Sequence, residues 1–168
     1  GSTNVSISHG GKIRQTAALL CAGGPVTADL VHGLQVTQQD AERIKERFGA
    51  AYEPLVPEDD VIQLPSTPGQ GARSAHRRVL AHIMHMRLQE VLEYALDEIT
   101  RAGYHQRLPA GVILTGGGAQ ATGIVELGRE VFAMPVRVGV PRQGLTGLAD
   151  SVETPRMVVP AGLALYGA

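Results

Sequence analysis

The feature that most constrains the fold of this chain is a short apolar run that ends in three consecutive glycines. It lies at residues 111–123 and reads GVILTGGGAQATG. Residues 111–114 have the composition of a buried strand, and residues 122–132 carry apolar side chains at helical spacing. Strand, glycine loop and helix in this order indicate an α/β fold. The glycines have two explanations: a tight turn, or a ligand lying against the backbone.

Two other segments also place bare backbone beside a predicted strand. They are residues 1–4 (GSTN) and the pair Gly23 and Gly24. The loops at 23–24 and 116–118 each precede a predicted helix, whose N-terminal N–H groups can bind an anion. One such glycine turn is usually structural. Three of them in one compact α/β chain favour a nucleotide-binding site.

Alternating apolar and polar residues predict the strands. Val5 and Ile7 alternate with polar residues, a His-Gly-Gly turn follows, and a return arm over 12–20 completes a hairpin. Residues 61–64 (VIQL), in a segment rich in proline, predict an edge strand. A last strand is expected over 136–140.

Helical periodicity predicts the longer elements. The first helix covers 26–34, with Gly33 as a plausible C-cap. Thr37 caps the second helix, which buries a stripe of Ala41, Ile44 and Phe48. The third and longest begins at Ser74 and runs to about Ala102, about 28 residues or ~42 Å. Its length exceeds what one small layer needs, so it is expected to support a second subdomain.

Composition excludes several classes of function. The net charge of −1 gives no general attraction to nucleic acids or anionic membranes. The single cysteine, Cys21, allows no intrachain disulfide and fits a reducing cytosol. No apolar run approaches the ~20 residues of a membrane span. His82 and His85 have no evident partner ligands for a metal, and no Ser-His-Asp or paired-carboxylate pattern is present.

Two polar groups have both a structural and a functional explanation. Glu42 and Lys45 are three residues apart and share one helix face. They could form a surface ion pair worth ~0.2–0.5 kcal/mol, or they could both bind ribose hydroxyls. Taken alone, the ion pair is favoured. Arg73 and Arg87 are fourteen residues apart, which on one helix leaves them about 40° apart. With Met84 and Met86 beside them, they could bind an acidic and apolar peptide.

Several of these segments together resemble a known family. Three of them are similar to motifs of the actin–Hsp70–sugar kinase superfamily. Residues 1–7 (GSTNVSI) resemble its second phosphate motif, residues 41–49 (AERIKERFG) its ribose helix, and residues 114–120 (LTGGGAQ) its adenosine motif. Four more resemble the FtsA family of bacterial cell-division proteins: 23–29 (GGPVTAD), the helix start at 73–74 (RS), 135–141 (PVRVGVP) and 147–150 (GLAD). The resemblance covers essentially the whole chain, in order.

The resemblance implies an actin-like (ribonuclease H-like) α/β lobe, with a mixed sheet flanked by helices and a smaller α+β insert. Residues 1–49 and 105–168 would form the nucleotide-facing subdomain IIA, and 50–104 the insert IIB. The chain would then be a fragment, because Gly1 falls inside the phosphate motif. The first phosphate loop, the self-association subdomain and a C-terminal amphipathic membrane helix would lie elsewhere in the protein.

The resemblance also implies roles for individual residues. The expected cofactors are ATP and Mg²⁺, and the nucleotide would be contacted by Gly1, Ser2, Thr3, Gly23, Gly24, Glu42, Lys45, Gly116, Gly117, Gly118 and Gln120. The tail of the tubulin-like protein FtsZ would be contacted by Arg73, Arg87 and Met84. No catalytic or metal-binding residue is expected in this chain.

The expected function is to tether FtsZ filaments to the cytoplasmic face of the inner membrane at the division septum. Self-association into filaments and recruitment of other division proteins would accompany it. Slow ATP hydrolysis is possible in the full-length protein, whereas this chain alone should be inactive and bind ATP weakly. The alternatives are an actin-like scaffold of a pilus-assembly or rod-shape machine and, less favoured, a sugar or acetate kinase lobe.

One residue departs from the family pattern. Pro160 falls inside a last helix that Thr154 and Pro155 are expected to open. A proline in a helix interior costs ~3 kcal/mol. The helix should therefore start later, near Val159, or kink.

Overall fold

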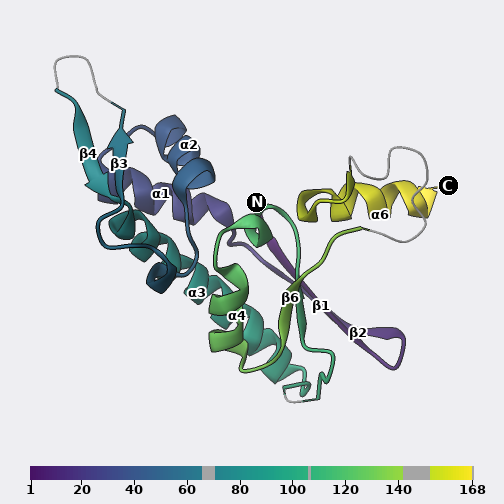
Figure 1. Ribbon diagram of the computed structural model, residues 1–168. Coiled ribbons are helices and arrows are strands. Elements are labelled where there is room, and N and C mark those ends of the chain that lie inside the picture. The colour runs from purple at the N-terminus through teal and green to yellow at the C-terminus, as the bar shows by residue number, and fades with distance from the viewer. Residues whose placement is uncertain (66–70, 106, 142–151, 168) are drawn as a thin grey trace.

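The computed structural model describes residues 1–65, 71–105, 107–141 and 152–167 (Figure 1). The similarity noted at 147–150 lies outside the described residues. Within them, the strands form three two-stranded sheets rather than the single mixed sheet that was expected. Two of these sheets are antiparallel and one is parallel, which keeps the α/β class that the sequence predicts.

The N-terminal hairpin is confirmed. Strand β1 (Thr3–His9) pairs antiparallel with β2 (Lys12–Leu19), with a register irregularity after Ile7. Gly10 and Gly11 form the two-residue turn, and their φ angles of 62° and 72° are those of a type I′ hairpin turn. Only glycine adopts two successive positive φ angles at little cost, so the turn is fixed by sequence.

Helix α1 (Gly23–Leu34) is longer than predicted at its N-terminal end. The prediction that Gly33 is its C-cap is wrong, because Gln35, at a φ of 53°, ends the helix instead. A Cβ on Gly33 would lie 2.5 Å from Cδ1 of Ile83. Position 33 therefore has little room for a side chain, because α1 packs closely against the long helix there.

Helix α2 (Gln38–Phe48) has the expected cap and stripe. The Thr37 hydroxyl accepts a hydrogen bond from the Asp40 amide at 3.2 Å and donates one to the Asp40 carboxylate at 2.7 Å. Ala41 and Ile44 are buried, and the helix ends at Gly49. The aspartate is too short to reach back to the Thr37 amide as a glutamate would, so its carboxylate bonds the hydroxyl.

The predicted start of the long helix is wrong. Residues from Arg73 to His76 form strand β4, which pairs antiparallel with β3 (Val61–Leu64), and helix α3 spans Arg77–Arg101. The Arg77 amide donates to the carbonyl of Asp60 at 2.8 Å. Ser74 lies opposite Gln63 in the ladder, so strand pairing satisfies the backbone that a helical cap would have satisfied.

The C-terminal part contains a parallel strand pair. Strands β5 (Val112–Leu114) and β6 (Val136–Val138) pair in parallel and are connected by the 3₁₀ turn η2 (Gly117–Gln120) and helix α4 (Ile124–Phe132). Strand β5 was expected to be buried, but Ile113 is 51% exposed. Helix α4 packs on the side of β5 that carries Leu114, and the Ile113 side remains open.

The last helix accommodates its proline. A 3₁₀ turn η3 (Pro155–Met157) precedes helix α6 (Val158–Gly167). Pro160 is therefore in the first turn of α6, where an amide has no helical partner in any case. The later start that the sequence offered as one alternative is the one observed, and the proline costs little.

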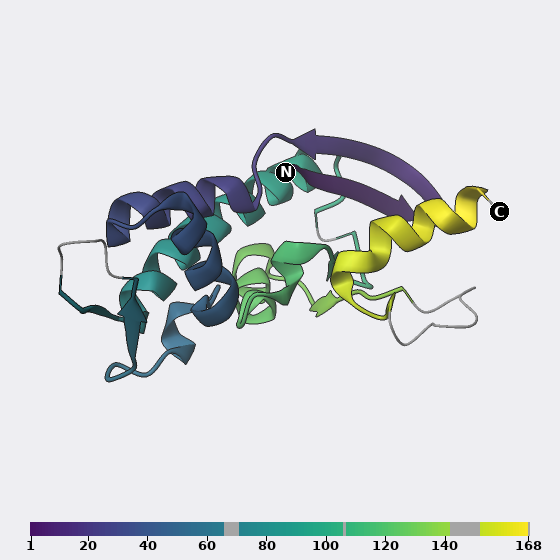
Figure 2. The same cartoon turned by 90° about the horizontal axis from the view of Figure 1, so that it is seen from above.

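Two apolar clusters share helix α3. One cluster joins β1, α4, β6 and the C-terminal half of α3, and the other joins α1, α2, β3 and the N-terminal half of α3. Figures 1 and 2 show α1, α2 and the β3–β4 hairpin toward one end of α3, with β1, β2 and α6 toward the other. The clusters thus group α1 and α2 with β3, although the ranges predicted for the subdomains assign them to different units. A 3₁₀ turn, η1 (Glu53–Leu55), links α2 to β3.

Candidate functional site

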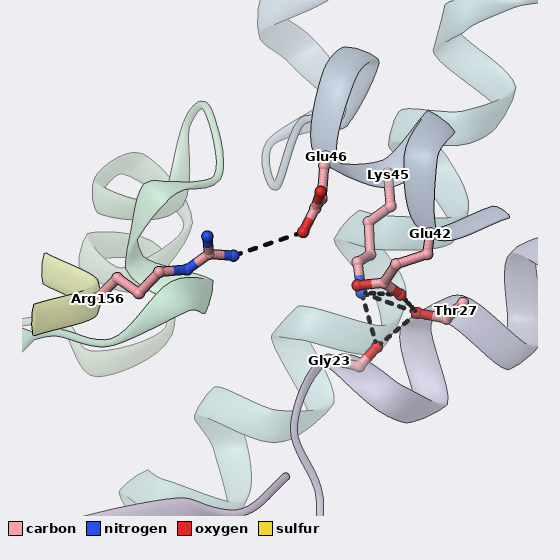
Figure 3. Close-up of polar contacts among 6 residues, drawn as sticks. All are labelled: Gly23, Thr27, Glu42, Lys45, Glu46 and Arg156. Carbon is pink, nitrogen blue, oxygen red and sulfur yellow. Dashed lines mark hydrogen bonds and ion pairs between the residues drawn. The ribbon is translucent and has the colours of Figure 1, made fainter. Parts of the chain in front are cut away.

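The first turn of α1 is held by the amino group of Lys45 from α2 (Figure 3). Lys45 Nζ donates to Glu42 Oε2 at 2.7 Å, to Thr27 Oγ1 at 2.8 Å and to the Gly23 carbonyl at 3.2 Å. The predicted Glu42–Lys45 pair therefore forms. It is not an isolated surface ion pair, because the Lys45 side chain is only 16% exposed.

Thr27 lies at the centre of this group. Among the described residues, Thr27 is the one polar side chain that is classed as buried, and it is 3% exposed. Its hydroxyl lies 2.5 Å from Glu42 Oε2 and 3.0 Å from the Gly23 carbonyl. The hydrogen bond from Lys45 is the main cause that lowers the pKa of the Glu42 carboxyl, and the hydrogen bond from Thr27 lowers it further. The carboxylate is thus the stable form of Glu42 at neutral pH.

The N-terminal residues lie against the same turn. The Thr3 hydroxyl donates to the Cys21 carbonyl at 2.7 Å. A Cβ on Gly1 would contact the Ala22 Cβ at 3.8 Å. The predicted phosphate-facing residues are thus next to the loop that enters α1. Ser2 is exposed beside them.

The glycines of the opening motif fall into two groups. A Cβ on Gly111 would lie 2.0 Å from the Pro135 carbonyl oxygen, and one on Gly123 would lie 2.6 Å from the Tyr52 Cβ. These two glycines have positive φ angles and are required by packing. A Cβ on any residue of 116–118 would meet no atom within 4 Å.

Within the open turn, only Gly116 has a positive φ, of 84°. Its amide donates to the Pro155 carbonyl at 3.0 Å. Gly117 and Gly118 begin η2 with neither a positive φ nor a close neighbour, so the fold alone does not require glycine there. Gln120 ends η2 and is exposed. This bare surface is compatible with a ligand that lies against the backbone.

Two contacts join α2 and the residues after it to segments that flank the glycine turn. The Ala51 amide donates to the Thr122 carbonyl at 2.7 Å. Arg156 of η3 forms an ion pair with Glu46 of α2, with 3.5 Å between its nitrogen and the carboxylate oxygen (Figure 3). The predicted ribose helix is therefore linked to η3, and the Pro155 carbonyl of η3 accepts from the Gly116 amide of the glycine turn.

Sequence reasoning missed Thr27 and Arg156. A threonine within the apolar face of α1, four residues after Gly23, was the available signal for Thr27. Nothing in the local pattern around Arg156 indicated its partner, which is 110 residues away.

The arginines do not share a helix face as predicted. Arg73 lies in β4 and donates to the carbonyls of Leu34 and Gln35 at 3.0 and 3.1 Å. The predicted separation of about 40° is wrong, because Arg73 is in a strand and only Arg87 is helical.

Arg87 is on α3 and holds the middle of α1. It donates to both carboxylate oxygens of Asp29, at 2.7 and 3.2 Å, and also bonds Glu90. Asp29 is the main cause that raises the pKa of Arg87 above its ordinary value. Met84 is 3% exposed and packs in the α1–α2 cluster, whereas Met86 is 56% exposed. The predicted Met84 surface is thus covered by the protein itself.

Two shallow grooves flank helix α3, away from the glycine turn. One, of about 510 Å³, includes Asp29, Met86 and Arg87 in its lining, and the other, of about 470 Å³, is lined in part by Glu53 and His82. In the described part of the chain, no three His, Cys, Asp or Glu side chains are grouped so that they could hold a metal ion. None of the described helices is both long and apolar enough to cross a membrane.

Comparison with known proteins decides the family. The family model for "Cell division protein FtsA" matches residues 1–162. The chain belongs to the FtsA family. Relatives named cell division protein FtsA include those of Pseudomonas aeruginosa, 38% identical over 99% of the chain, and Escherichia coli K12, 34% identical over 99%. The chain spans 40% and 41% of the length of these two relatives.

Solved structures show the same fold at low sequence identity. MreB5 of Spiroplasma citri bound to AMPPNP matches 99% of this FtsA-family chain and 52% of its own, with a TM-score of 0.69 and 13% identity. The ethanolamine utilization protein EutJ from Carboxydothermus hydrogenoformans matches 99% of the chain and 46% of its own, with a TM-score of 0.66 and 20% identity. The actin-like fold predicted from the sequence is confirmed.

Proposed function

We propose that this chain is the nucleotide-facing lobe of an actin-like, ATP-binding cell division protein. The full-length protein tethers FtsZ filaments to the cytoplasmic face of the bacterial inner membrane at the septum, assembles into filaments and recruits other division proteins. Membership of the FtsA family and the actin-like fold support this proposal. The family match favours it over a scaffold of another actin-like machine.

The observation that carries the nucleotide role is the pairing of a fixed polar group with an open glycine turn. Glu42 and Lys45 are oriented by Thr27 and lie on α2. The Glu46–Arg156 ion pair links α2 to η3, whose Pro155 carbonyl accepts from the Gly116 amide of the turn. A carboxylate and an ammonium can bind ribose hydroxyls, and bare backbone allows an adenine ring to approach closely.

The remaining predicted residues have roles that fit their positions. Gly1, Ser2 and Thr3 lie beside the loop that enters α1 at Gly23 and Gly24, where backbone amides can face phosphates. Gln120, exposed at the end of η2, would add a polar contact to the adenosine. Bound Mg-ATP would supply the phosphates and the cation that these residues approach. Two of the similar structures, both of MreB5, are bound to ADP and to AMPPNP.

Calorimetric titration with Mg-ATP tests the nucleotide role. The full-length protein should bind Mg-ATP, and Gly118→Val should weaken binding because it fills the open space above the backbone. Its melting temperature should remain that of wild type. Equal affinity in both proteins would remove the glycine turn from the site. The chain of 168 residues alone should show no micromolar affinity.

The FtsZ role of Arg73 and Arg87 needs a test that separates contact from stability. Charge reversal of either arginine would also release α1, since both bind it. Asp29→Asn is the matched control, because it weakens the grip on α1 but leaves Arg87 in place. A short acidic and apolar FtsZ tail peptide should bind wild type and Asp29→Asn, but not Arg87→Gln. Equal loss in Asp29→Asn and Arg87→Gln would assign Arg87 to structure alone.

A further inference from the structure

We propose that Thr27 is a positioning residue of the nucleotide site, where its buried hydroxyl sets the arrangement of Glu42 and Lys45 that receives the ribose. This inference rests on the proposed nucleotide role of that pair. Thr27 itself touches no nucleotide in this scheme. It acts through Glu42, which would touch the ribose, and through Lys45, whose three donors hold Glu42 and the first turn of α1.

The donors and acceptors around the Thr27 hydroxyl match in number. Lys45 Nζ has three N–H donors, and the three acceptors within reach are Thr27 Oγ1, Glu42 Oε2 and the Gly23 carbonyl. Thr27 accepts from Lys45 and has a single proton for Glu42 or for Gly23. The three side chains therefore form a closed triangle whose sides are 2.5, 2.7 and 2.8 Å.

Thr27 is a rigid anchor for the longer and more exposed side chain of Glu42. The Glu42 side chain is 48% exposed, and an exposed ion pair alone holds two long side chains poorly. Thr27 is buried and β-branched, so its rotamer is restricted and its hydroxyl is a fixed point. A site binds more tightly when its ligand-contacting groups are held in place before binding.

One oxygen of the Glu42 carboxylate remains for a ligand. The contacts that Glu42 makes within the described chain all go through Oε2. Since the carboxylate is half exposed, Oε1 is the oxygen that can accept a ribose hydroxyl. Thr27 thus occupies one carboxylate oxygen, and the other makes no hydrogen bond within the described chain.

The experiment compares ATP with 2′,3′-dideoxy-ATP, which lacks both ribose hydroxyls, in the full-length protein. Wild type should prefer ATP by about tenfold or more, the size expected for hydrogen bonds to charged groups. Thr27→Val should reduce this preference to less than about threefold. Thr27→Ser, which restores a hydroxyl, should recover it.

Thr100→Val is the matched control. Thr100 donates its hydroxyl to the carbonyl four residues earlier in its helix, Leu96, at 2.9 Å, and the Thr27 hydroxyl likewise lies 3.0 Å from the carbonyl of Gly23, four residues before it. This variant should keep the wild-type preference. A general effect of losing a helical threonine is thereby separated from an effect on Glu42 and Lys45.

The outcomes distinguish the inference from the proposed function. If Thr27→Val keeps the wild-type preference while Glu42→Gln loses it, Thr27 is not a positioning residue but the ribose role of Glu42 stands. If wild type does not bind ATP, or if Glu42→Gln changes nothing, the proposed site and this inference both fall. Thr27→Ala replaces Thr27→Val if the valine variant does not fold. Unfolding of both variants would make the role of Thr27 purely structural.

Discussion

The two groups of glycines in the 111–123 segment predict different effects of a change to alanine: a loss of stability at the packed glycines and almost no change at the open ones. In Gly111→Ala the new methyl group would lie 2.0 Å from the Pro135 carbonyl oxygen, and the residue would keep a φ of 72°. The left-handed conformation costs an alanine ~1–2 kcal/mol. Overpacking against a backbone atom that cannot rotate away costs a further ~1–3 kcal/mol. The expected loss of stability is therefore about 2–5 kcal/mol.

This loss should be measured by thermal unfolding followed by circular dichroism. For a chain of this size, each kcal/mol corresponds to about 2–4 °C, so Tm should fall by at least about 4 °C. Gly118→Ala is the matched control, because a Cβ there meets no atom within 4 Å and φ is not positive. Its Tm should stay within about 2 °C of wild type. A fall of similar size in both variants, or in neither, would refute the division of the glycines into packed and open groups.

Three further predictions concern the core, a helix cap and pH. Leu127→Ala should cost ~2–5 kcal/mol in denaturant unfolding, because Leu127 is fully buried between α4 and its neighbours. Thr37→Ala should cost ~1 kcal/mol by the same assay, through loss of the bond to the Asp40 amide, whereas Thr37→Ser should cost less. The pKa of Glu42 is lowered in the folded state, so its contribution to stability is present above its unfolded pKa and is lost as pH falls through the lower folded value. Glu42→Gln should flatten that part of the pH–stability curve, and an unchanged curve would contradict the Lys45 and Thr27 contacts.

Local signals predicted the elements whose reasons are local. The hairpin turn at Gly10 and Gly11 needs two positive φ angles, and the Thr37 cap needs only residues three positions away. The apolar stripe of α3 was visible because it repeats over many turns. Each of these features is fixed by neighbours in sequence, which is why a sequence alone reveals it.

Features fixed by distant residues were predicted poorly. Ser74 is as acceptable in a strand as at a helix cap, and only pairing with Gln63 decides between them. Because of that error, Arg73 was assigned to the start of the long helix, although it lies in β4. Gly33 was taken for a cap, although its small size is explained by Ile83 on another helix. Periodicity placed Met84 on the apolar stripe of α3 but could not tell that α1 and α2 cover it.

The candidate site followed the same division. Glu42 and Lys45 were found because they are three residues apart on one helix. Thr27 was missed because its partners come from a helix that begins eleven residues later. The glycines of 116–118 were found as a motif. Their difference from Gly111 and Gly123, which are required by packing, depends on which atoms lie nearby and is not visible in the sequence.

Helix α3 determines how this lobe can move. Its 25 residues contain neither glycine nor proline, and Leu88 near its middle packs against both apolar clusters. Helices kink where such breakers occur, so α3 has no built-in hinge between the clusters. The two clusters should therefore translate and rotate as one lever of about 37 Å. A small rotation of the cluster around α4 would therefore be carried along α3 to the β3–β4 end.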